Sequence, residues 1–100
     1  MEYKPPLEDI KFVLDELLNV NEMTSFPGYE EASMDMMELI LEELGESAIQ
    51  TWFPLNRVGD QEGCKFDNGK VTTPTGFKEA YRETCESGQS SLSCEIEHGG

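Results

Sequence analysis

The stretch that most constrains the fold is residues 33–58, the longest segment of the chain with one regular hydrophobic period. Its apolar side chains recur at steps of three and four, which places them on one face of an α-helix. These apolar positions are Met37, Ile40, Leu41, Leu44, Ala48, Trp52 and Leu55. The pattern therefore predicts a long amphipathic central helix whose apolar face needs neighbours.

The boundaries of this central helix can also be predicted. Ser33 is a good N-cap, and Asp35 lies in the first turn, where the helix dipole favours an anion. Pro54 cannot donate a backbone hydrogen bond, so we expect a kink there, with the helix continuing to Val58. Gly45 costs about 1 kcal/mol relative to alanine. Its missing side chain would let another helix approach closely.

Length and charge narrow the class of protein. One hundred residues allow one small domain. The 21 acidic and 7 basic side chains give a net charge of −14, which would repel a nucleic acid or an anionic membrane. No apolar run approaches the ~18 residues of a membrane span, and no leader follows Met1. Three irregularly spaced cysteines suit reduced thiols, so we expect a cytoplasmic protein.

Residues 1–32 predict an N-terminal extension helix followed by a connector. Pro5 and Pro6 suit a first helical turn, and the helix is expected to run to about Asn19. Its apolar stripe consists of Ile10, Val13, Leu14, Leu17 and Leu18. The connector carries a Phe26-Pro27-Gly28 turn and room for one short helical turn. Its apolar side chains, Met23, Phe26 and Tyr29, are expected to attach it to the core.

A β-hairpin is predicted over residues 63–74, after a loop at residues 59–63. Asn68-Gly69 between alternating side chains is a strong signal for a two-residue turn. Such a turn pairs Asp67 with Lys70, Phe66 with Val71 and Cys64 with Thr73. We expect the face that carries Cys64, Phe66 and Val71 to lie against a helix, because an isolated hairpin is marginal in water. The alternative is an irregular loop.

A third helix is predicted over residues 74–88, with Thr73 as its N-cap and Gly88 as its stop. Its inward stripe would be Phe77, Ala80, Tyr81, Thr84 and Cys85. The polar tail, residues 89–100, lacks a closing element, so the chain resembles an interrupted domain. The predicted fold class is therefore mainly α: a small helical bundle with one β-hairpin.

The cysteines and the histidine are the first candidates for chemistry. Cys94 and His98 lie four residues apart, and Cys64 and Cys85 are further potential metal ligands. This spacing matches no zinc pattern, which would need a close ligand pair at each end of the site. A Cys–His nucleophilic pair would also need an orienting third group. Buried or unreactive cysteines are the simpler interpretation.

Carboxylate pairs and methionines are the remaining candidates. The pairs at residues 30–31 and 42–43 fit a solvated helix face, since neighbours on a helix point apart. Met34, Met36, Met37 and Phe53 could form a soft binding groove, but core filling is the commoner use of methionine. No phosphate-binding loop or dinucleotide motif occurs. We therefore assign no catalytic, cofactor-binding or metal-binding residue.

Several motifs in order resemble the N-terminal segment of bacterial acyl-CoA dehydrogenases. They are YKPPLEDIKFVLDELL at residues 3–18, PGYEEAS at 27–33, PLNRVGDQEGC at 54–64, VTTPTGFKEAYR at 71–82 and EHGG at 97–100. The likeness covers nearly the whole chain, and it is to the subgroup with an N-terminal extension, similar to 3-methylmercaptopropionyl-CoA dehydrogenases. One departure is Ser87-Gly88-Gln89, where that family usually has Gly-Gly-Trp.

The resemblance implies a structural portion of an FAD enzyme that dehydrogenates acyl-CoA thioesters and passes electrons to an electron-transfer flavoprotein. In that family the flavin site and the catalytic glutamate belong to later domains, so this chain alone is expected to bind no FAD and to catalyse nothing. Its partners would be those domains, or another copy that covers Trp52 and Phe53. The alternative is an autonomous acidic interaction module without catalysis.

Overall fold

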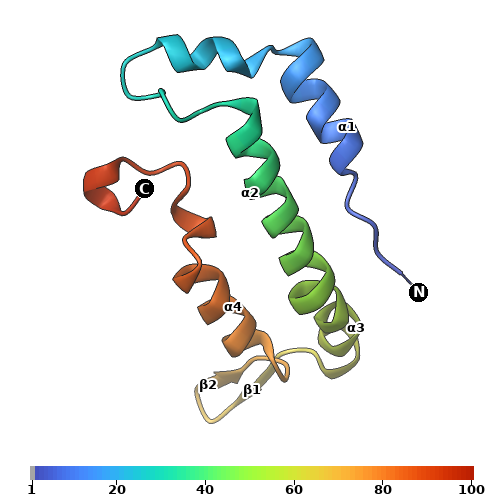
Figure 1. Cartoon of the computed structure of the whole chain (residues 1–100). Coiled ribbons are helices and arrows are strands. Elements are labelled where there is room, and N and C mark those ends of the chain that lie inside the picture. Colours follow the sequence, from blue (N-terminus) through green and yellow to red (C-terminus); the bar gives the residue numbers. More distant parts are fainter. Residues whose placement is uncertain (1) are drawn as a thin grey trace. The chain divides into compact units, whose positions relative to one another are not determined.

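The computed structural model describes residues 2–100 and divides the chain into two compact units, residues 1–49 and 50–100. Helices make up most of both units, and the only strands in the described part of the chain form one antiparallel hairpin (Figure 1). The predicted mainly α fold with one hairpin is confirmed. No helix within residues 2–100 is both long and apolar enough to cross a membrane.

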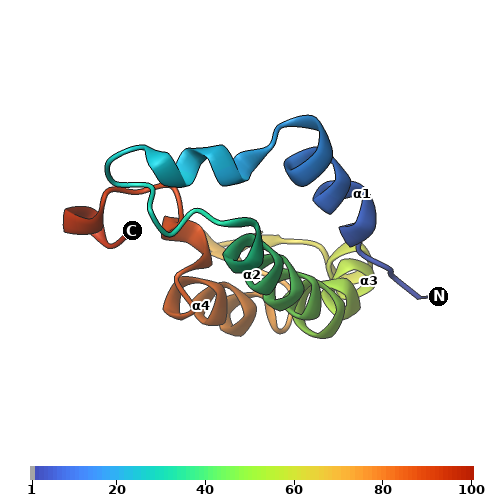
Figure 2. The ribbon, with the colours of Figure 1, turned by 45° about the horizontal axis from the view of Figure 1, so that its top comes forward.

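The first unit begins with helix α1, Leu7–Phe12, which continues as a π-helical segment, Val13–Leu17. This helix ends slightly earlier than predicted because Asn19 adopts a left-handed conformation, with φ at 47°. The connector contains one short 3-10 helix, Val20–Ser25, as expected. Helix α2, Met34–Ser47, then lies beside α1 (Figure 2).

Only one of the three side chains predicted to hold the connector, Met23, is even half-buried. Phe26 and Tyr29 are 57% and 54% exposed, so their expected role in attaching the connector is wrong. Val20 is buried instead, and the Asn21 side-chain oxygen accepts a hydrogen bond from the backbone N–H of Met34 at 2.8 Å. Phe26 has extended backbone just before a turn, and the turn points the ring outward.

The N-terminus of α2 is capped as predicted. The Ser33 hydroxyl accepts a hydrogen bond from the backbone N–H of Met36 at 3.2 Å. Together with the bond from Met34 to Asn21, this contact satisfies two of the N–H groups that a helix leaves without internal partners. The start of the central helix therefore agrees with the sequence.

The second half of the central helix runs further than predicted. A π-helical segment, Ala48–Trp52, precedes helix α3, Phe53–Glu62, so helical backbone continues past Pro54 and past Val58. Pro54 occupies the first turn of α3, where its missing N–H costs little. The helix stops at Gly63, which has φ at 64°. The predicted loop at residues 59–63 is wrong, because all but its last residue are helical.

The hairpin has the predicted register. Strand β1, Lys65–Asp67, pairs with β2, Lys70–Thr72, and Phe66 lies opposite Val71. Asn68 and Gly69 both have positive φ, as the tight turn requires. The expected cover by a helix is wrong, since Phe66 and Val71 are 75% and 67% exposed. The strands are only three residues long, and the contacts between α3 and the next helix are made by residues outside the hairpin.

Helix α4, Phe77–Glu86, starts later than predicted, after a left-handed Gly76 rather than after Thr73. Phe77, Ala80 and Thr84 are buried or half-buried, whereas Tyr81 and Cys85 are exposed and do not belong to the inward stripe. Gly88 stops the helix with φ at 81°, as predicted. Beyond it, residues 89–100 contain only two short 3-10 helices, Gln89–Ser91 and Ile96–His98.

Candidate functional site

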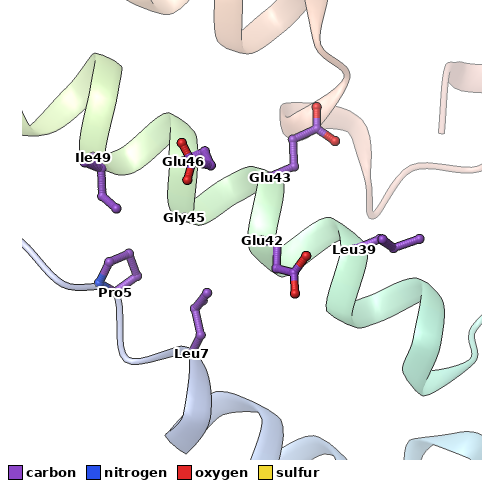
Figure 3. Close-up of a pocket in the computed structure, with 8 residues that line it drawn as sticks. All are labelled: Pro5, Leu7, Leu39, Glu42, Glu43, Gly45, Glu46 and Ile49. Atoms are coloured by element: carbon purple, nitrogen blue, oxygen red, sulfur yellow. The ribbon is translucent and has the colours of Figure 1, made fainter.

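A groove of about 460 Å³ lies in the first unit, between α2 and the segment that enters α1. Pro5 and Leu7 form one side of this groove, and α2 forms the other (Figure 3). Gly45 is the buried residue at which the two sides meet. A side chain at position 45 would have its first carbon 3.4 Å from a Leu7 methyl and 3.5 Å from Pro5. Leu7, the first residue of α1, and Pro5 therefore approach Gly45, but at ordinary van der Waals distances that leave room for a methyl group.

Three carboxylates and two aliphatic side chains complete the α2 side of the groove: Glu42, Glu43, Glu46, Leu39 and Ile49. Figure 3 shows Glu42 directed toward Leu7 and Glu43 directed away from it. Lys11 lies with its ammonium group 3.9 Å from Glu42 and 3.9 Å from Glu8. These pairs are open to water and contribute little to stability. The groove suits an aliphatic group beside a positive charge, and its lining contains no hydroxyl, thiol or imidazole group.

The candidate metal ligands are not brought together. Cys64, Cys85 and Cys94 are free and exposed thiols. Nowhere in residues 2–100 do three histidine, cysteine, aspartate or glutamate side chains gather closely enough to hold a metal ion. His98 lies 3.5 Å from the carboxylate of its neighbour Glu97. Of the two simpler interpretations, buried or unreactive cysteines, burial is wrong, and the exposed thiols are accessible to reagents.

The carboxylate pair at residues 30–31 has a structural use. Glu30 accepts a hydrogen bond from the backbone N–H of Gly28 at 3.2 Å, across the turn that follows Pro27. Its own backbone N–H and then that of Gly28 lower the pKa of Glu30, since both stabilise the charged form. Glu31 is exposed to solvent. The pair therefore stabilises a turn, and it is not arranged for acid–base catalysis.

A second carboxylate joins two elements of the second unit. Glu62, the last residue of α3, accepts hydrogen bonds from the backbone N–H of Thr75 at 2.8 Å and from its hydroxyl at 3.0 Å. These two bonds lower the pKa of Glu62, the backbone donor having the larger effect. The contact closes the chain around the hairpin, ahead of α4. Sequence reasoning missed it, because thirteen residues separate the partners and no local pattern marks them.

Trp52 and Thr84 form a further polar contact in the second unit. The indole N–H donates to the Thr84 hydroxyl at 3.1 Å, and that hydroxyl donates to the Ala80 carbonyl at 2.9 Å. The indole N–H of a part-buried tryptophan is thereby satisfied. Trp52 was assigned to the apolar face, which is correct, but its hydrogen bond was not predicted.

The methionines are mainly structural. Met34 is 7% exposed, so the core-filling interpretation is confirmed for it. Met37 is half-buried and Met36 is exposed. Among the described residues, the only hydrophobic side chains classed as buried are Val20, Met34 and Ala80. The apolar faces that the sequence predicts are therefore formed but only partly covered.

Two known proteins are similar to this chain in sequence. No family profile matches the chain. The chain is 36% identical over 100 residues to 3-methylmercaptopropionyl-CoA dehydrogenase of Ruegeria pomeroyi. The aligned region covers 100% of this chain and 17% of that protein. The chain is also 33% identical over 90 residues to butyryl-CoA dehydrogenase of Syntrophomonas wolfei. That aligned region covers 86% of this chain and 15% of that protein. The chain thus spans about one sixth of the length of these relatives.

Proposed function

We propose that this chain, whose resemblance to acyl-CoA dehydrogenases is confirmed along its whole length, forms an N-terminal structural portion of such an enzyme. In the intact enzyme an acyl-CoA thioester would lose hydrogens from its α and β carbons to FAD, and an electron-transfer flavoprotein would accept the electrons. The observation that carries the proposal is the similarity to two such dehydrogenases over 100% and 86% of the chain.

The site geometry supports a structural rather than a catalytic contribution. The carboxylates of the groove, Glu42, Glu43 and Glu46, are exposed. Glu30 and Glu62 lie outside the groove, and each accepts hydrogen bonds that hold a turn or a loop and lower its pKa. A general base would need its pKa raised toward neutrality by burial, whereas these two pKa values are lowered. The free thiols support a reducing, cytoplasmic environment.

The exposed apolar side chains also support a larger assembly. Sixteen large hydrophobic side chains of the described residues are exposed, and eleven of them belong to the first unit. Such side chains, where they form a contiguous patch, mark a surface that contacts another protein. The remaining domains of the parent enzyme would supply that surface.

The test is to sequence the gene beyond Gly100 and to express the longer product beside this chain. We expect the reading frame to continue for several hundred residues, because the relatives are about six times longer. After gel filtration with excess FAD, the longer product should retain flavin and this chain should not. A stop codon directly after Gly100 would favour an autonomous acidic interaction module, and flavin retained by this chain would refute the structural assignment.

A further inference from the structure

The net charge of the chain is concentrated in its first unit. Residues 1–49 carry 13 acidic and 2 basic side chains, and residues 50–100 carry 8 and 5, so −11 of the net −14 lies in the first unit. One of the two basic side chains, Lys11, lies within 3.9 Å of both Glu8 and Glu42. Any surface that docks on this unit meets a strong negative field.

The same unit exposes an apolar stripe, which we call the α1 stripe. It consists of Ile10, Val13, Leu17 and Leu18, which are 36%, 40%, 70% and 60% exposed. Leu7, which lies beside Gly45 of α2, and Leu14 are half-buried. Four of the five residues predicted for the apolar face of this helix are therefore exposed, and only Leu14 is partly covered. The exposed residues run along α1 and the π-helical segment that follows it, up to Leu18.

Carboxylates border the α1 stripe on its own helix. Asp9, Asp15 and Glu16 alternate with the apolar residues and are exposed. Their charge opposes contact with another acidic surface, including a second copy of this chain, whose net charge is also −14. Apolar area surrounded by negative charge is complementary to apolar area surrounded by lysines and arginines.

We propose that the α1 stripe docks on a helical surface that carries aliphatic side chains bordered by lysine and arginine, within the part of the parent enzyme that this chain does not span. This inference rests on the proposed function, because the chain covers only 17% and 15% of its relatives and the rest of their length can supply the surface. Docking removes the α1 stripe from water, and the basic border pairs with Asp9, Asp15 and Glu16.

The first arm of the test uses this chain and three synthetic peptides in titration calorimetry. One peptide is an amphipathic helix of leucine and lysine, the second has glutamate in place of lysine, and the third has the leucine and lysine in scrambled order. We expect the first peptide to bind at least about tenfold more tightly than the other two, and more weakly as salt rises. Equal binding of the scrambled peptide would show attraction by charge alone and would overturn the proposal.

Matched variants locate the binding surface. Leu17→Ser removes an exposed leucine of the α1 stripe, and Leu92→Ser removes one that is 56% exposed in the second unit. Leu17→Ser should weaken binding of the leucine–lysine peptide about fivefold to tenfold, while Leu92→Ser should not change it. Both positions are exposed, so both variants should keep the circular dichroism spectrum of the parent. Equal effects of the two substitutions would overturn the assignment of the surface.

The second arm separates this inference from the proposed function. Hydroxyl-radical footprinting compares Leu17 and Leu92 in this chain and in the longer gene product. We expect strong protection of Leu17 in the longer product. If the longer product is an active dehydrogenase in which Leu17 stays as reactive as in this chain, the inference fails and the proposed function stands. If the gene ends at Gly100, the proposed function and the assigned source of the partner both fail.

Discussion

Gly59 in helix α3 gives the sharpest test of the packing in the second unit. A side chain built at this position would have its first carbon 2.6 Å from the tip of the Phe77 ring and 3.2 Å from the adjacent ring carbon. Carbon atoms in contact prefer about 3.5–4.0 Å, so the ring would have to move by about 1 Å. Gly59→Ala therefore sets a helix-propensity gain against a collision.

The two effects have different sizes. Replacing an interior helical glycine by alanine stabilises a helix by about 1 kcal/mol, whereas overpacking typically costs about 1–3 kcal/mol. Phe77 is half-buried, so its ring can yield in part. We expect Gly59→Ala to lower the free energy of unfolding by up to about 2 kcal/mol. Phe77→Leu removes the outer ring atoms, and in that background Gly59→Ala should be neutral or stabilising.

Urea unfolding followed by Trp52 fluorescence measures all four members of this cycle, because Trp52 belongs to the same unit. Gly45→Ala is the matched control. Its nearest contacts, at 3.4 Å and 3.5 Å, are ordinary van der Waals distances, so this substitution should stabilise the first unit by up to about 1 kcal/mol by circular dichroism. If Gly59→Ala stabilises the protein as much in the parent as in the Phe77→Leu background, the reasoning about this contact is wrong.

Three further predictions address the turns and caps. Gly76→Ala should destabilise the second unit by about 2 kcal/mol or more in urea unfolding, because the φ angle of Gly76 is +88° and a Leu55 methyl would lie 2.8 Å from the new carbon. A smaller loss of stability than that caused by Gly59→Ala would contradict this prediction. Thr75→Val removes one of the two donors to Glu62, so an NMR titration should show the Glu62 pKa rising toward its ordinary value. Because the folded pKa of Glu62 is lowered, its stabilising effect exists above the ordinary pKa and is lost as pH falls through the folded pKa, and this loss should shrink in Thr75→Val. Ser33→Ala should cost about 1 kcal/mol of stability through loss of the N-cap, whereas unchanged stability would refute a role for that hydrogen bond.

Local signals predicted the helices and the hairpin, and tertiary contacts decided their ends. Ser33, the Asn68-Gly69 turn and Gly88 act through bonds or backbone angles within a few residues, so the sequence alone identified them. The length of α3 was not predictable in the same way. Gly59 suggested a loop, yet it is accommodated within a helix, where its lack of a side chain admits the Phe77 ring.

Exposure was the hardest property to predict. Periodicity correctly gave an apolar face to the first helix, but it could not say that most of this face, Leu17 included, would be exposed. The hairpin face with Phe66 was expected to be covered for the same reason and is not. The bond between Glu62 and Thr75 depends on the path of the chain around the hairpin, which no spacing rule encodes.

Our central proposal is that this chain contributes structure to an acyl-CoA dehydrogenase and no chemistry of its own. The most direct test adds butyryl-CoA, without oxygen, to a mixture of the protein and FAD and follows the flavin absorbance. With the longer gene product the flavin colour should bleach, and with this chain alone it should stay unchanged. Bleaching by the chain alone would contradict the account. So would a folded longer product that binds FAD but whose flavin is not reduced by any acyl-CoA.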